Sequence, residues 1–175
     1  MTFKKVALTT ALLASVSAIS LNANADASAE VTLQGIVTNT TCNVTVNGGK
    51  SVLNVGVFKS NAFTANTITT EKVDMPVTLT DCADTAAGQL IIQGLTSTGN
   101  NEQNIFVSTD NETVGFMIQD ETPDIVVNGT GPTLSIFDDE SVVNTYTFKV
   151  GMASTTADPT AGSYSAPILV AYVVN

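Results

Sequence analysis

The last twelve residues, YSAPILVAYVVN (residues 164–175), decide the fold. Alternate positions carry apolar or aromatic side chains, which form one face of a β-strand: Tyr164, Ala166, Ile168, Val170, Tyr172 and Val174. The opposite face is also apolar over Leu169, Ala171 and Val173, and no strand-forming sequence follows within the chain. An apolar, β-prone strand without a neighbour is an aggregation hazard. We therefore expect this strand to need a partner strand, and Pro167 near its start suits a sheet edge.

A second unusual stretch, AEVTLQGIVTNTTCNVTV (residues 29–46), lies early in the chain. Its first half has one mostly apolar face, formed by Ala29, Val31, Leu33, Gly35 and Val37. Eighteen extended residues span about 60 Å, whereas a domain of this size has a diameter of about 35–40 Å. The stretch therefore either bends near residues 38–41 or projects beyond its own domain. Self-closure, with both terminal strands filling one sandwich, remains the alternative.

Between these stretches, short apolar runs alternate with turn signals such as Asn47-Gly48-Gly49 and Asn128-Gly129. The runs cover residues 51–58, 73–80, 89–95, 114–119, 133–137 and 142–152. Many short strands at this spacing are typical of an all-β sandwich or barrel. Spare apolar strands at both ends favour head-to-tail polymerisation, in which a contact that does not close produces a filament.

The N-terminus has the pattern of an export signal. Lys4 and Lys5 precede an apolar stretch over residues 6–21, and Ala23-Asn24-Ala25 resembles a cleavage site. We expect a signal peptide over residues 1–25, an extension over 26–38 and one domain over 39–175. The exported chain would then contain two cysteines, Cys42 and Cys82, which we expect to form a disulfide. Closing that loop contributes about 4 kcal/mol on the chain-entropy model.

Charge and composition exclude several classes of function. After residue 25 the chain has four lysines, no arginine and sixteen acidic residues, so its net charge is 4 − 16 = −12. Nucleic-acid binding, which needs basic side chains, is therefore not expected. Without histidine, no Ser-His-Asp or Cys-His catalytic arrangement can form. We expect no enzyme activity, metal or cofactor, and we interpret the acidic clusters at residues 120–124 and 138–140 as solvated turns.

Several motifs, taken in order, resemble the pilins of the chaperone–usher pathway (type 1-like fimbrial subunits). LQGIV (33–37) is followed by Cys42, seven residues after Gly35, and PVTLTDC (76–82) contains the second cysteine. VGFMIQD (114–120), YTF (146–148) and GSYSA (162–166) follow, with Gly162 fourteen residues from the end. The chain departs from the family at its penultimate position, where Val174 replaces the usual tyrosine.

The resemblance implies an incomplete immunoglobulin-like β-sandwich that lacks its last strand. A periplasmic pilus chaperone would lend a strand to the groove, and at the outer-membrane usher the extension of the next pilin would replace it. The implied donor strand contains Ala29, Val31, Leu33, Gly35 and Val37. The implied acceptor groove involves the C-terminal strand and the residues before it: Gly162, Tyr164, Ile168, Val170, Tyr172, Val174 and Asn175.

The function implied is that of a structural subunit of a fimbria on the bacterial surface, supporting cell adhesion. The alternative is a minor adaptor or a sugar-binding adhesive subunit of the same fibre. Gly35 admits two interpretations, because a glycine weakens a strand and its presence needs a reason. It provides either a local bend or a flat point where a shallow groove admits no side chain.

Overall fold

The computed structural model describes residues 35, 37, 42–82, 87–136 and 144–174. All of them belong to one compact unit, Gly35–Asn175. The implied donor residues Ala29, Val31 and Leu33, and also Asn175, lie outside the described residues.

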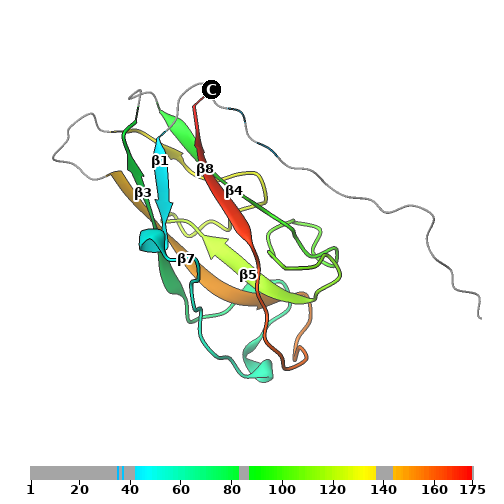
Figure 1. The fold of residues 1–175 in the computed structure, drawn as a ribbon. Helices are drawn as coiled ribbons and strands as arrows, with labels where there is room; N and C mark the ends of the chain where they lie inside the picture. The colour runs from blue at the N-terminus through cyan, green and yellow to red at the C-terminus, as the bar shows by residue number, and fades with distance from the viewer. Residues whose placement is uncertain (1–34, 36, 38–41, 83–86, 137–143, 175) are drawn as a thin grey trace, which may run out of the picture. The chain divides into compact units, whose positions relative to one another are not determined.

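The described residues form two antiparallel sheets and no α-helix (Figure 1). In the larger sheet, β7 is central: β3 and β2 pair with successive parts of one edge, and β5 pairs with the other. β1 pairs with the far edge of β3. The strands are β1 (Asn43–Val46), β2 (Thr67–Ile68), β3 (Val73–Thr80), β5 (Val114–Gln119) and β7 (Asn144–Ser154).

The smaller sheet has the order β6-β4-β8, where β6 is Thr133–Leu134, β4 is Gly88–Gly94 and β8 is Ile168–Val173. Two short 3-10 turns, η1 (Asn47–Gly49) and η2 (Ser60–Ala62), follow β1. The all-β sandwich predicted from the sequence is confirmed. Within the described ranges, none of the helical segments has the length and apolar character needed to cross a membrane.

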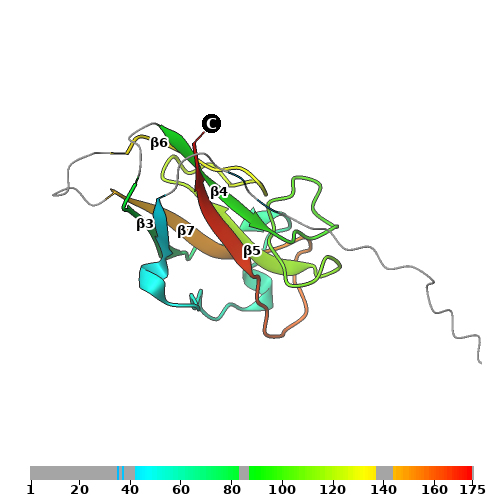
Figure 2. The same ribbon diagram turned by 45° about the horizontal axis from the view of Figure 1, so that its top comes forward.

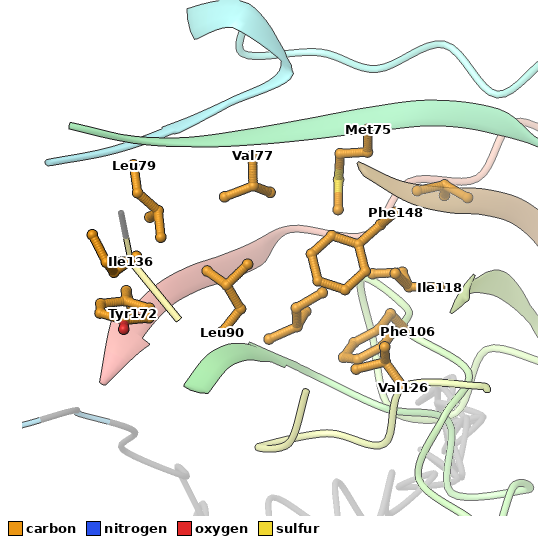
Figure 3. Packing of buried hydrophobic residues seen from close by; sticks show 12 residues of the cluster. Met75, Val77, Leu79, Leu90, Phe106, Ile118, Val126, Ile136, Phe148 and Tyr172 are labelled. Carbon is orange, nitrogen blue, oxygen red and sulfur yellow. The ribbon is translucent and has the colours of Figure 1, made fainter. Parts of the chain in front are cut away.

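Alternating side chains build the core between the two sheets (Figure 3). Met75, Val77 and Leu79 of β3 point inward and are buried, as the period-2 pattern of a strand requires. They pack in one cluster with Leu90 of β4 and Tyr172 of β8, among others. Because β8 contributes to this cluster, the C-terminal strand is an integral part of the folded domain.

One side of the sandwich is closed by the segment 105–107. The continuation of β4 bonds to it, with Ser97 N–H donating to the carbonyl of Ile105 at 2.9 Å. On its other edge, the backbone of Phe106 exchanges hydrogen bonds of 2.8 and 2.9 Å with Phe116 of β5. Phe106 points into the main core, while Ile105 and Val107 pack in a second cluster on Met117. This segment therefore joins the two sheets along that side, although the sequence patterns had not indicated a strand there.

Candidate functional site: an open seam

The other side of the sandwich is formed by β1 and β8, which lie close together in space. In the described part of the chain, β1 has registered pairing only with β3, and β8 only with β4 (Figure 2). No described bridge corresponds here to the 105–107 segment of the closed side. We call this side the open seam. One wall consists of β1 and of residues 50–58, which follow it. The other wall consists of residues 159–167 and of β8, which follows them.

A hollow of about 530 Å³ lies between the two walls of the open seam, where residues 52–58 meet residues 159–164. Side chains from β5 and β7 complete the lining, including Phe116 and Met152. The lining contains neither a carboxylate nor an amine. A ligand of this hollow should therefore be uncharged where it enters, because burying an unpaired charge is costly.

The acceptor residues predicted from the sequence lie along one wall of the seam. Ile168, Val170 and Val174 are half-buried and pack against the main core cluster. Tyr172 is only 3% exposed, and its hydroxyl approaches the carbonyl of Leu134 at 3.4 Å. Tyr172 therefore supports the wall from within the core, whereas Leu169 on the opposite face is 53% exposed.

The other wall corrects a prediction, because the run 51–58 forms no strand. Val52 and Val57 are 75% and 98% exposed, although the sequence pattern suggested a paired element. Gly56 interrupts the segment with φ of 120°, a region that favours glycine, and its N–H donates to the side-chain oxygen of Asn54 at 3.0 Å. The segment is thus an apolar rim of the hollow without a strand neighbour in the described residues.

The opposite rim of the hollow is held in place by Tyr164. Its hydroxyl donates to the carbonyl of Thr160 at 2.7 Å, which closes a tight loop. A Cβ atom on Gly162 would lie 3.3 Å from both the Cζ atom and the hydroxyl oxygen of Tyr164, inside ordinary packing distance. The absence of a side chain at Gly162 therefore lets the tyrosine side chain pack close to the loop. Sequence reasoning had selected both residues but had not indicated this contact.

Of the donor strand, the structure describes only Gly35 and Val37. Val37 is 94% exposed. A Cβ atom at Gly35 would meet nothing within 4 Å, and Gly35 is not among the described residues with positive φ. The described domain therefore imposes neither a steric nor a conformational need for glycine at this position.

Cys42 and Cys82 form a disulfide, with Cα atoms 4.1 Å apart. It links the residue before β1 to the residue two positions after β3, so it covalently fastens the short β1 wall to the main sheet. The predicted pairing of the two cysteines is present in the structure.

The acidic cluster at residues 120–124 forms a turn away from the hollow's lining. One carboxylate oxygen of Asp120 accepts hydrogen bonds from Thr122 and from the backbone of Asp124. The backbone N–H of Glu121 donates to the Tyr146 hydroxyl, whose pKa is raised chiefly by burial. Among the described residues, no three potential metal ligands gather. The cluster at 138–140 lies outside them.

Comparisons with known proteins identify the fold. No family model matches the sequence, and no curated protein matches it. A chain from the structure of a chaperone–usher pilus is similar, with a TM-score of 0.60 and 15% identity over 86% of this chain and 97% of that one. The P pilus rod subunit PapA is similar with a TM-score of 0.60 and 15% identity, over 76% of this chain and 98% of that one. A Burkholderia pseudomallei antigen and type I fimbria protein is similar with a TM-score of 0.50 and 18% identity, over 77% of this chain and 95% of that one.

These similarities show that the chain has the fold of chaperone–usher pilus subunits. They agree with the fold that the motif resemblance implied, an immunoglobulin-like β-sandwich.

Proposed function

We propose that this chain is a structural subunit of a bacterial surface fimbria, in which each copy fills the open seam of the next with its extension over residues 29–37. The observation that supports the proposal is the difference between the two sides of the sandwich. A bridging segment joins the sheets on one side, while β1 and β8 meet at the other without registered pairing in the described residues. Strand addition to such an edge is a known mode of recognition.

The chemistry of the proposed donor suits the seam. The hollow presents no charged group, and the apolar face of the extension carries none. Burying Val31, Leu33 and Val37 completely would contribute roughly 5–9 kcal/mol before ordering costs. Backbone hydrogen bonds along β8 would add to this and slow dissociation. A protein of this kind acts through assembly and performs no catalysis.

Export and assembly complete the proposal. An uncovered apolar seam would aggregate, so the subunit needs a temporary strand from a periplasmic chaperone before it reaches an outer-membrane usher. At the usher, the extension of a neighbouring subunit takes the place of the chaperone strand. The product is a head-to-tail fibre on the cell surface.

Deleting residues 26–38 tests the proposal. Chains that begin at residue 26 and at residue 39 should both fold when a pilus chaperone is co-expressed. After release, only the longer chain should form fibres visible by electron microscopy and ladders on gels run without boiling. Fibre formation by the shorter chain would contradict strand donation from this extension.

The Tyr164 loop provides a subtler prediction, measured as binding of a labelled peptide spanning residues 29–38. Gly162→Ala should push the tyrosine ring by a few tenths of an ångström and narrow the hollow that it lines. We expect binding to weaken severalfold, while the free energy of unfolding changes by less than about 1 kcal/mol because the loop is exposed. Ser165→Ala, at an exposed position of the same segment outside the lining of the hollow, is the matched control. Equal peptide affinity for both variants would rule out the role given to the ring.

A further inference from the structure

The turn after β1 is held by the side chain of Asn47 and by a backbone hydrogen bond of 3.2 Å from Lys50 N–H to the carbonyl of Asn47. Asn47 adopts a left-handed φ of 53°, followed by Gly48 at 60° and Gly49 at 79°. Its side-chain amide donates to the carbonyl of Val52 at 2.9 Å and to that of Lys50 at 3.3 Å. Val52 is the first residue of the rim that lines the hollow. The Asn47 amide thus ties the end of β1 to the beginning of that rim.

Asparagine followed by glycine is chemically labile, because glycine has no Cβ to hinder attack by its own backbone nitrogen on the asparagine side chain. The chain contains two such pairs, Asn47-Gly48 and Asn128-Gly129. Gly48 and Gly49 are exposed, so water reaches the first pair and the turn can open without disturbing the core.

The second pair is held in the fold at three points. The attacking nitrogen of Gly129 already donates to the carbonyl of Ile92 at 2.8 Å. The side-chain oxygen of Asn128 accepts a hydrogen bond from Gly94 N–H at 3.1 Å. The backbone N–H of Asn128 donates to the carbonyl of Gln103 at 2.9 Å. Reaction there requires local unfolding next to β4, which costs more free energy than opening an exposed turn.

We propose that Asn47 is a site of spontaneous deamidation, with water as the co-reactant, and that the conversion releases the rim of the hollow. The Gly48 nitrogen bonds to Cγ of Asn47 and gives up its proton, the Cγ–Nδ2 bond breaks, and ammonia leaves. Water then opens the cyclic imide to aspartate or isoaspartate. The net reaction consumes one water, produces one ammonia and involves no electron transfer.

The product cannot perform the same structural role. A carboxylate has no hydrogen to donate at neutral pH. It would therefore lose the hydrogen bonds to the carbonyls of Lys50 and Val52, and its oxygens would repel those carbonyl oxygens. The isoaspartate product also lengthens the backbone by one methylene in a turn built from three successive left-handed residues. Both effects free residues 50–58 from the end of β1.

The first test is chemical and does not depend on the proposed function. The chain from residue 26, purified as its complex with a co-expressed pilus chaperone, is incubated at mildly alkaline pH and digested, and conversion at the two pairs is followed by mass spectrometry. Asn47 should convert at least roughly tenfold faster than Asn128. In strong denaturant the two rates should become similar, which is the internal control. An intact Asn47, or equal rates in the folded chain, would overturn the assignment.

The second test addresses release of the rim. Asn47→Asp should speed hydrogen exchange of the backbone amides of Lys50 and Gly56 severalfold, whereas amides in β3 should be unaffected. Asn61→Asp adds the same charge at an exposed position outside the turn, and it should leave these rates unchanged. Unaltered exchange in Asn47→Asp, or the same increase in both variants, would show that the Asn47 amide does not hold the rim.

Discussion

Replacing Gly35 by leucine in a synthetic peptide spanning residues 29–38 is expected to abolish its exchange into the open seam of a neighbouring subunit. The donor face has bulky side chains at Val31, Leu33 and Val37, and glycine interrupts it. If the groove is flat at that register, a leucine overpacks it. Overpacking costs about 1–3 kcal/mol or more, and a displaced strand also loses neighbouring backbone bonds. The measurement is the rate and extent of exchange against chaperone-bound subunit.

Gln34→Leu is the matched control, because it adds the same side chain on the opposite parity of the strand. That peptide should exchange as well as the native one. The competing interpretation assigns Gly35 to a local bend, and a free peptide has no bend to make. Equal exchange by native and Gly35→Leu peptides would therefore defeat the shallow-groove interpretation while leaving strand donation intact.

Loss of the Cys42–Cys82 disulfide should have the largest effect on stability. The two cysteines are 40 positions apart, and opening a loop of this size removes about 4 kcal/mol on the chain-entropy model. That is a large part of the 5–15 kcal/mol typical of a domain. Urea unfolding of the subunit saturated with a peptide spanning residues 29–38, oxidised and reduced, should show a much lower midpoint for the reduced form. In cells, Cys82→Ser should lower subunit levels through proteolysis of unfolded chain.

The double variant Cys42→Ser, Cys82→Ser separates the effect of the cross-link from that of one unpaired thiol. It should unfold at nearly the same urea concentration as the reduced wild type. Matching midpoints for the oxidised protein and the double variant would show that the cross-link contributes little. Free thiols in protein taken directly from the periplasm would contradict the predicted oxidation state.

The sequence patterns located the long strands well, because β3 has a strict side-chain period and β5 is a continuous apolar run buried on both faces. The runs expected at 73–80 and 114–119 coincide with β3 and β5. The patterns failed at residues 51–58, because an apolar run was interpreted there as a paired strand. The segment has no neighbouring strand among the described residues, and Gly56 breaks its extended path. Composition shows that a residue can be buried, whereas pairing depends on which edge lies beside it.

The patterns also missed Ile105-Phe106-Val107, the segment that closes one side of the sandwich. Three apolar residues between polar turns are too few to define a period, and their strand character depends on backbone pairing with Thr96 and with Phe116 of β5. Likewise, Tyr164 and Gly162 were selected from a motif, but the hydrogen bond to Thr160 follows from loop geometry. The proposed donor residues Ala29, Val31 and Leu33 stay a prediction.

The position of the disulfide has a mechanical consequence in a fibre assembled as proposed. Tension would enter each subunit through its extension and reach the domain at Cys42, directly before a strand of four residues. Such a short strand could be peeled away one hydrogen bond at a time. The disulfide instead transfers the load to Cys82, two residues beyond the end of β3, a strand that is paired with both β1 and β7. Pulled along its axis, β3 would resist in shear, with many backbone bonds loaded together, so a reduced fibre should break at lower force.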